Sequence, residues 1–493
     1  MKGWRLLACC WLAIATLGAQ RATPPTMREV LTAAYAVRDL SEVELSPYGD
    51  AVAWQETFHD PQRLLGSPRW SSLYVSSLSG KARVRLSAGA DGRYYDEENP
   101  AWSPDGQSLA FLSDARSKDQ LQVFVSDVCG QHFRQVGRLR GDVSHLSWSP
   151  DGKTLAVLYI ASAHRAAGAL APGARDVGVI GSEIDEQRLT LIDPKSGAVR
   201  TVTRADRYVY EYGWSPDARR VAVTYAPGNG DNNWWIARLA TVDVATGNMR
   251  DLLTPAYQIN DPQWSPDGKR IAIVGGLMSD FGSTGGDLYV VDALSGEARD
   301  VTAGAAFSVQ SSRWNDATSI DVVAHVPGAM HLMRVDVTSG QTTQLTDREE
   351  SLWSWSTAEK GSVIALVRAS FDDPPELWAG TPPALRQVTH SNANATRLYG
   401  KAVSLRWTSD GSDVQGWLIY PLDFDPARTY PMVTIVHGGP SSQTVPSFAT
   451  RNVSALSSAG YFVLMPNPRG SYGRGEAFTR ANVKDFGYGD WRD

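Results

Sequence analysis

The stretch AWSPDGQSLAFLS, residues 101–113, joins a tight turn to a short apolar strand. In Ser-Pro-Asp-Gly, proline presets one backbone angle, aspartate bonds to nearby backbone and glycine accepts a positive φ, so the segment favours a reverse turn. The alternation after it is typical of a half-buried strand. The pattern recurs along the chain, as WSPDG at 102–106, 148–152 and 264–268, as WSPDA at 214–218, and in weaker form at 45–49, 314–318 and 355–359.

Each of these seven repeats continues into a second pair of strands. In LYVVDALSGEARDVT, residues 288–302, the Ser-Gly pair closes a hairpin. Four strands repeated every 40–50 residues or so are typical of a propeller blade, and radial packing of the blades covers their faces. We therefore predict a seven-bladed β-propeller over residues 41–390, after a helical segment over 27–40. We expect the recurrent Trp to pack between blades.

The pattern changes after His390. MVTIV at 432–436 and YFVLMPNPRG at 461–470 are apolar without alternation, which predicts strands that are buried on both faces. The segment at 452–460 reads as the end of a helix that stops at Gly460. A strand, a helix and a second buried strand indicate an α/β sheet. We predict that residues 391–493 form the N-terminal part of an α/β-hydrolase domain, which is incomplete in this chain.

The loop HGGP, residues 437–440, follows the first of these strands. In α/β-hydrolases a loop at this place supplies one N–H group of the oxyanion hole. Glycine lets the backbone approach a substrate and aim N–H groups at the oxyanion. Gly438 and Gly439 are therefore the candidate oxyanion-hole residues. The alternative is a turn that only ends the strand.

No nucleophile accompanies this loop in the sequence. A nucleophile elbow needs Gly-x-Ser-x-Gly, and RGSYG at 469–473 has Arg469 in place of the first glycine. His437 is the only histidine after His390, so no Ser, Asp and His triad can be assembled. HExxH zinc motifs and P-loops are absent as well, and we expect no metal and no organic cofactor.

The propeller repeats followed by HGGP and NPRGSYGRGEAF (467–478) resemble the prolyl oligopeptidase family of serine peptidases, most of all its acylaminoacyl-peptidase and dipeptidyl-peptidase branches. The resemblance implies a propeller that caps a hydrolase domain and admits only short peptides. It implies that the Gly439 N–H is an oxyanion donor, that Gly438 shapes the loop and that Arg469 is a buried ion-pair partner. The catalytic Ser, Asp and His would lie beyond Asp493, so we expect this chain, as an incomplete record of a longer protein, to be inactive as given.

Composition and the N-terminus suggest where the protein works. The net charge is −6 and no basic run is present, so we expect no nucleic-acid partner. MKGWRLLACCWLAIATLGAQ predicts a signal peptide over residues 1–19, with a membrane anchor as the alternative. Cys129 would be the one cysteine left after cleavage. We expect a secreted, periplasmic protein without a membrane segment.

Specificity is open between aminopeptidase, dipeptidyl-peptidase, acylaminoacyl-peptidase and endopeptidase action, and so is the oligomeric state. Acidic residues that could hold a substrate amino group occur at 97–98 and 349–350 and at the end of the insert over 160–188. We interpret all of them as surface charges. The alternative function is a non-enzymatic propeller used for binding or scaffolding.

Overall fold

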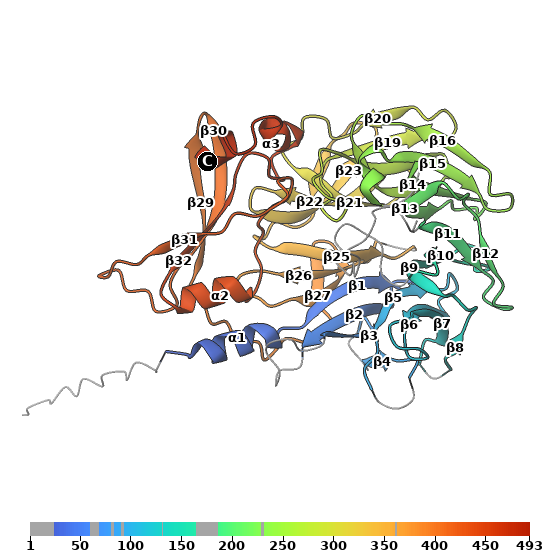
Figure 1. Ribbon diagram of the computed structural model, residues 1–493, viewed down its shortest axis with the longest axis horizontal. Helices are drawn as coiled ribbons and strands as arrows, with labels where there is room; N and C mark the ends of the chain where they lie inside the picture. Colours follow the sequence, from blue (N-terminus) through green and yellow to red (C-terminus); the bar gives the residue numbers. More distant parts are fainter. Residues whose placement is uncertain are drawn as a thin grey trace, which may run out of the picture.

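In the computed structural model the described residues are 24–493, except 60–68, 80–82, 90–92, 131, 164–185, 228–230 and 360–361. The predicted signal peptide and most of the insert lie outside them. Within the described part, seven four-stranded antiparallel sheets follow one another along the chain (Figure 1). The predicted seven-bladed β-propeller is confirmed.

Every blade consists of four consecutive strands, ordered in the sheet as in the sequence. Blades 1 and 2 are β1 (Asp39–Leu45), β2 (Ala51–His59), β3 (Arg69–Ser77), β4 (Val84–Leu86) and β5 (Glu97–Trp102), β6 (Ser108–Ser113), β7 (Gln122–Asp127), β8 (Arg134–Gln135). Blades 3 and 4 are β9 (Gly141–Trp148), β10 (Leu155–Ala161), β11 (Arg188–Ile192), β12 (Val199–Thr201) and β13 (Arg207–Trp214), β14 (Arg220–Pro227), β15 (Arg238–Asp243), β16 (Met249–Leu253). Blades 5 and 6 are β17 (Gln258–Trp264), β18 (Arg270–Gly276), β19 (Asp287–Asp292), β20 (Ala298–Asp300) and β21 (Ser308–Trp314), β22 (Ser319–Val326), β23 (Ala329–Asp336), β24 (Thr342–Gln344). Blade 7 is β25 (Ser351–Thr357), β26 (Ile364–Ala369), β27 (Glu376–Thr381) and β28 (Ala384–Gln387).

The repeated turn forms for the reason that the sequence indicates. Ser103 Oγ donates to Asp105 Oδ1 at 2.6 Å, and that carboxylate also accepts the Gln107 N–H at 3.0 Å. Gly106 follows with φ +67°. The recurrent Trp packs between blades as predicted, because its indole N–H bonds to a backbone oxygen of the preceding blade: Trp102 to Glu44, Trp148 to Ala101 and Trp314 to Gln263, at 3.0, 3.1 and 3.0 Å.

Each innermost strand carries a β-bulge, which the sequence alternation did not reveal. The register shifts in β1, β5, β9, β13, β17, β21 and β25. At four of these bulges a residue other than glycine has a positive φ, namely Glu42, Asn99, His145 and Asp261. A bulge re-aims a side chain. All four residues line a cavity of about 680 Å³ along the propeller axis.

Among the described strands, none is exchanged between blades 7 and 1 where the ring closes. Side chains of β25 accept backbone N–H groups of β1, with Ser354 Oγ 2.8 Å from the Val43 nitrogen and Ser356 Oγ 3.1 Å from the Leu45 nitrogen. Apolar side chains of both blades form one buried cluster behind these bonds. The seam is therefore held by packing and by side-chain hydrogen bonds, not by a shared sheet.

A helix precedes the propeller. The predicted helical segment is α1 (Met27–Ala36), and a capping box between Thr26 and Glu29 starts it. Asn392, just after blade 7, ties the chain at the end of this helix to the exit from the propeller. The Asn392 amide accepts the Arg38 N–H at 2.8 Å and donates to the Arg38 carbonyl at 2.9 Å.

The C-terminal segment forms an eighth sheet beside the propeller. Its strands lie in the order β29, β30, β32, β31, and β31 pairs with β32 in parallel. Its elements are β29 (Ala402–Ser409), β30 (Ser412–Ile419), β31 (Met432–Thr434), α2 (Arg451–Ser458), β32 (Phe462–Asn467), α3 (Glu476–Thr479), the 3-10 helix η2 (Arg480–Asn482) and α4 (Gly489–Arg492). α2 ends before Gly460, which has φ +88° as its predicted role as a helix stop requires. In Figure 1, α1 and α2 lie side by side, and their residues are in contact.

One strand prediction is wrong. Residues 432–436 were expected to be buried on both faces, but β31 covers only Met432–Thr434 and lies at the sheet edge. The side chains of Met432 and Val436 are 56% and 59% exposed. An edge strand has a neighbour on one side only, so apolar composition cannot bury it by itself.

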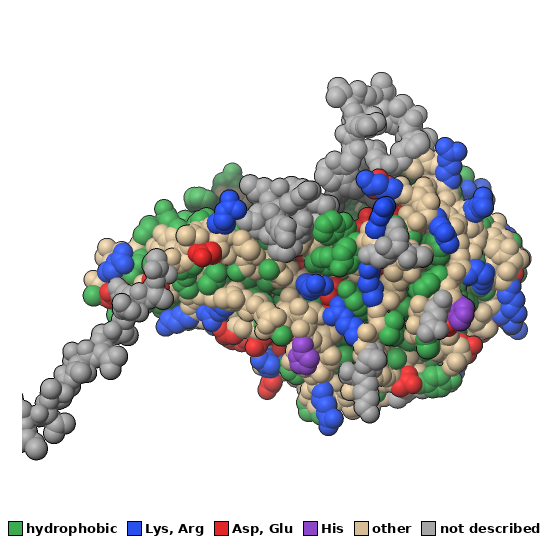
Figure 2. Space-filling model, turned by 90° about the horizontal axis from the view of Figure 1, so that it is seen from below, with side chains coloured by type: hydrophobic (Ala, Val, Ile, Leu, Met, Phe, Trp, Pro, Cys, Tyr) green, Lys and Arg blue, Asp and Glu red, His purple; other side chains and the backbone are tan. Residues whose placement is uncertain are grey.

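The described surface has mixed charge. Seen from below in Figure 2, Lys and Arg side chains are spread over the propeller, with Asp and Glu among them. None of the helices in the described ranges combines the length and the apolar character that a bilayer crossing requires.

Candidate active site

The two candidate oxyanion residues lie in the loop after β31. Gly439 has φ +137°, a conformation that favours glycine. A Cβ on Gly438 would meet no atom within 4 Å, so this part of the loop faces open space. Among the described residues, none accepts a hydrogen bond from the N–H of Gly438 or Gly439. Two bare backbone donors beside open space are what an oxyanion site requires, and their catalytic role stays a prediction.

His437 holds this loop against the following strand–loop segment. Its Nε2 lies 2.9 Å from Ser471 Oγ, and that hydroxyl donates to the Pro468 carbonyl at 2.6 Å. On its other side, the Nδ1 of His437 lies 3.1 Å from the Gly438 carbonyl, so the ring bridges the loop and Ser471. Burial lowers the pKa of His437, so this imidazole is held neutral.

Ser471 resembles a nucleophile in its pairing with histidine, but its surroundings exclude that role. The residue is 1% exposed, and its hydroxyl proton points at a carbonyl. A serine nucleophile needs access to the substrate carbonyl and a base that accepts its proton. The pair therefore anchors the loop.

A propeller loop fixes the residue that follows HGGP. The loop at 277–286, between β18 and β19 of blade 5, provides two serines for Ser441. Ser279 Oγ accepts the Ser441 N–H at 2.6 Å, and Ser283 Oγ donates to the Ser441 carbonyl at 2.7 Å. The Tyr472 hydroxyl donates to the Ser283 carbonyl at 2.7 Å. The glycines are thus positioned by the propeller as well as by their own sheet.

The turn between β22 and β23 of blade 6 makes the second docking contact. The side-chain oxygen of Gln443 accepts a hydrogen bond from the ring N–H of His325, and its side-chain nitrogen donates to the carbonyl of Val326. The Trp417 indole donates to the Gly328 carbonyl at 3.0 Å. The His325 ring also stacks on Tyr472, with centroids 5.4 Å apart. Sequence reasoning could not find these partners, because they lie 89 residues or more away in the chain.

Arg469 behaves as the resemblance implied. Its side chain is 12% exposed and lies 2.7 Å from Asp493 and 3.1 Å from Asp410. Hydrogen bonds to these carboxylates raise its pKa further above the usual arginine range. This ion-pair group fixes α4 to the sheet.

The axial cavity is lined by several acidic residues. Glu42, Glu44, Glu211 and Asp261 line it, together with Gly282 and Thr284 of the blade 5 loop. Burial raises the pKa of Glu44 to about 7 and that of Glu211 to about 8. The loop at 277–286 therefore borders both the axial cavity and the HGGP segment.

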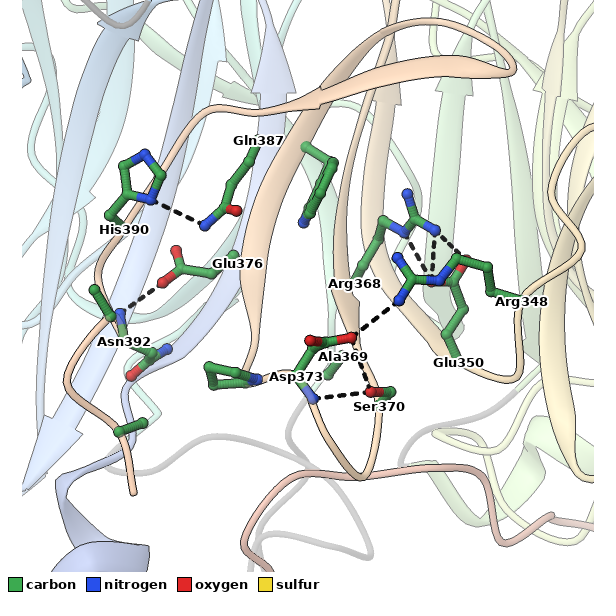
Figure 3. Close-up of a pocket in the computed structure, with 14 residues that line it drawn as sticks. Arg348, Glu350, Arg368, Ala369, Ser370, Asp373, Glu376, Gln387, His390 and Asn392 are labelled. Carbon is green, nitrogen blue, oxygen red and sulfur yellow. Dashed lines mark hydrogen bonds and ion pairs between the residues drawn. The ribbon is translucent and has the colours of Figure 1, made fainter. Parts of the chain in front are cut away.

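A second cavity, of about 390 Å³, lies at blade 7 and is drawn in Figure 3. Its charged groups pair with one another: Arg368 with Glu350 at 2.8 Å, and Arg348 with Asp373 at 3.0 Å. The Glu376 carboxylate accepts the Asn392 N–H at 2.7 Å. We assign it no catalytic role, because its charges are already neutralised.

The interpretation of the acidic pairs as surface charges is wrong for two residues. Glu97 is fully buried, and Glu350 is 2% exposed. Glu97 accepts the Ala88 N–H at 3.0 Å, and Glu350 binds Arg368. Both carboxylates therefore support the blades. Of the three acidic residues at the end of the insert, Glu183, Asp185 and Glu186, only Glu186 is described, and it accepts the Asp206 N–H at 3.2 Å.

The comparisons with known proteins match this architecture. Residues 446–493 match the model of the prolyl oligopeptidase family. Dipeptidyl-peptidase 5 of Porphyromonas gingivalis is 28% identical over 213 residues, which are 42% of this chain and 31% of that protein. Probable dipeptidyl-peptidase 5 of Aspergillus terreus is 40% identical over 88 residues, 18% of this chain and 12% of that protein. The matched segments thus span less than a third of either relative.

A solved structure shows the same fold. The acylaminoacyl peptidase of Pyrococcus horikoshii superposes with a TM-score of 0.71 at 17% identity, covering 93% of this chain and 70% of that one. The likeness confirms the predicted succession of a propeller and an α/β-hydrolase-type segment.

Proposed function

We propose that this chain, whose C-terminal segment belongs to the prolyl oligopeptidase family, is part of an exported serine peptidase that cleaves short peptides. One observation carries the proposal. Among the described residues, the N–H groups of Gly438 and Gly439 have no hydrogen-bond acceptor, and their loop borders open space at Gly438 while its own sheet and the propeller hold it in place. Such preorganised donors stabilise the oxyanion of acyl transfer.

In this mechanism a serine attacks the peptide carbonyl, a histidine takes its proton and an aspartate orients that histidine. The Gly439 N–H donates to the oxyanion, and Gly438 leaves room for the substrate. The sequence contains no Gly-x-Ser-x-Gly elbow, so we place the nucleophile outside residues 1–493. We expect the 493-residue chain by itself to be inactive.

The propeller would limit access to this site. Blades 5 and 6 contact Ser441 and Gln443 directly, so a substrate has to reach the loop past the propeller face or through the axial cavity. We expect either path to admit an extended peptide and to exclude a folded protein. The names of the relatives make dipeptidyl amides the first substrates to test, with N-acylaminoacyl amides second.

The test is labelling of the native protein with a fluorophosphonate, which reacts with activated serines. Peptide mapping then locates the label, and hydrolysis of both amide classes is followed by fluorescence. We expect hydrolysis and a label on a serine that is not among residues 1–493. A label on Ser471 would overturn the assignment of that residue to the loop anchor. Absence of both labelling and hydrolysis would contradict the peptidase proposal and favour a binding propeller.

A further inference from the structure

A short helix of blade 4 exposes two large apolar side chains. The 3-10 helix η1 (Asp231–Ile236) connects β14 to β15. Trp234 is buried at 1% exposure, whereas Trp235 and Ile236 are 47% and 58% exposed. The rings of the two tryptophans lie 5.0 Å apart. The buried ring thus serves as a base on which the exposed one rests.

η1 is bonded to the loop that positions the candidate oxyanion site. The Trp234 indole donates to Asn260 Oδ1 at 3.2 Å. The amide nitrogen of Asn260, which is 2% exposed, donates to Thr284 Oγ1 at 2.8 Å and to the Phe281 carbonyl at 3.3 Å. The Trp234 and Phe281 rings pack edge to face at 5.8 Å. Asn260 therefore joins η1 and the blade 5 loop into one unit.

The same loop holds the residue next to Pro440. Ser279 and Ser283 fix both backbone groups of Ser441, as described above. η1 also lies on the same propeller face as this loop, because each connects the second and third strands of its blade. The position of Trp235 relative to the Gly439 N–H is therefore set by a continuous series of short contacts.

η1 is thus joined by contacts to the propeller face that holds the HGGP loop. We therefore propose that Trp235, with Ile236 beside it, is a specificity-determining residue. It binds an apolar side chain of the peptide at a position remote from the scissile bond. The proposal rests on the proposed peptidase function. An extended peptide advances at most about 3.3–3.6 Å per residue, so a substrate that reaches the Trp235 ring has to extend several residues from the scissile bond. Indole offers a flat apolar surface with little rotamer entropy to lose.

The selected group would be aromatic or large aliphatic. Burial of such a side chain against Trp235 and Ile236 removes apolar surface of both partners from water. A polar side chain at the same position would lose hydrogen bonds to water and find none at the exposed indole face. Discrimination by apolar contact alone is modest, on the order of tenfold or somewhat more.

The test uses the active native protein and a set of heptapeptides. All peptides share the residues that flank the scissile bond, and each carries one Phe or one Gln at one of the remaining positions in turn. We expect one position at which Phe raises kcat/KM about tenfold over Gln. Trp235→Ala should bring the ratio of kcat/KM between the Phe and Gln peptides close to one, mainly by raising KM for the Phe peptide. Trp235→Phe should retain the preference.

Two controls separate a contact from a folding defect. Leu294→Ala removes a 79% exposed leucine from the outer hairpin turn of blade 5 and should leave the ratio unchanged. Trp235→Gln keeps bulk at the site and should lose the ratio as Trp235→Ala does. An unchanged ratio in both Trp235→Ala and Trp235→Gln, or no position with a Phe preference, would overturn the proposal while the peptidase function stands. If no peptide is cleaved at all, the peptidase proposal fails and this one with it.

Discussion

His325 of blade 6 and Gln443 of the C-terminal segment form a hydrogen bond across the junction between the propeller and the eighth sheet, with Nδ1 2.9 Å from Oε1. Gln443 also donates to the neighbouring Val326 carbonyl, so its oxygen is oriented to accept. The imidazole therefore carries its proton on Nδ1. Burial lowers the pKa of His325 to about 4, and His437 nearby acts in the same direction.

This bond makes the junction sensitive to acid. A histidine with a depressed folded-state pKa favours the folded state while it is neutral, so its contribution is complete above its ordinary pKa of about 6.5 and is lost as the pH falls toward 4. The shift corresponds to roughly 3 kcal/mol at most. Thermal melting from pH 7.5 to 4 should show a steeper loss for the wild type than for His325→Gln, which keeps a donor. The other ionisable groups near the junction include His437, Tyr472, Glu476 and Asp280, and they are common to both proteins. If the melting temperatures of the wild type and His325→Gln fall in parallel with pH, His325 is not the group that makes the junction sensitive to acid.

The two loop glycines should respond differently to alanine. A Cβ at Gly439 would lie 2.8 Å from the Ser441 nitrogen, and its φ of +137° is strained for alanine. Gly439→Ala should therefore displace the N–H donor and lower kcat about 10²–10³-fold. Gly438→Ala meets open space and should fold normally, so it serves as the matched control for melting temperature. Equal activity of Gly439→Ala and wild type would remove Gly439 from the oxyanion hole.

The seam of the propeller should depend on Asn392. Asn392→Ala leaves the N–H and the carbonyl of Arg38 without their partner, which costs about 1–3 kcal/mol for buried groups. We expect a lower melting temperature and faster proteolysis near α1. Asn248→Ala, on an outer strand turn of blade 4, is the comparison variant. An equal drop in melting temperature in Asn392→Ala and Asn248→Ala would show that the contact between Asn392 and Arg38 has no special effect on stability.

The protein should lose stability as the Glu211 carboxyl group is forced to ionise. Burial and the neighbouring Asp261 raise the pKa of Glu211 from its ordinary value of 4.5 to about 8. A carboxyl group with a raised folded-state pKa contributes fully to folding below its ordinary pKa, and loses that contribution as the pH rises from there through the folded-state pKa. Glu211→Gln, which cannot ionise, should flatten the decline in the urea midpoint between about pH 5 and pH 8. A variant whose urea midpoint still declines as that of the wild type does would place the titration at another group.

The features that were predictable from the sequence are local ones. Ser-Pro-Asp-Gly encodes its own turn through contacts between neighbouring residues, so the number of blades could be read from it. The bulges at Glu42 and Asp261 depend on pairing with the next strand and left no periodic signal. The strand at 432–436 was misread because apolar composition does not tell a central strand from an edge strand. The HGGP loop was predicted, but the partners that position it, Ser279 and Ser283, are set by tertiary structure alone.

The seam between blades 7 and 1 has a mechanical consequence. Ala34 and Val37, which lie before blade 1, and Ala395, which lies after blade 7, all pack into the apolar cluster formed by Trp417, Phe448 and Val463 of the C-terminal segment. That segment therefore bridges the two ends of the ring, in addition to the direct contacts between blades 7 and 1. Lifting it from the propeller face would remove apolar contacts from both ends at once. We therefore expect opening of the junction to be coupled to loosening of blades 1 and 7.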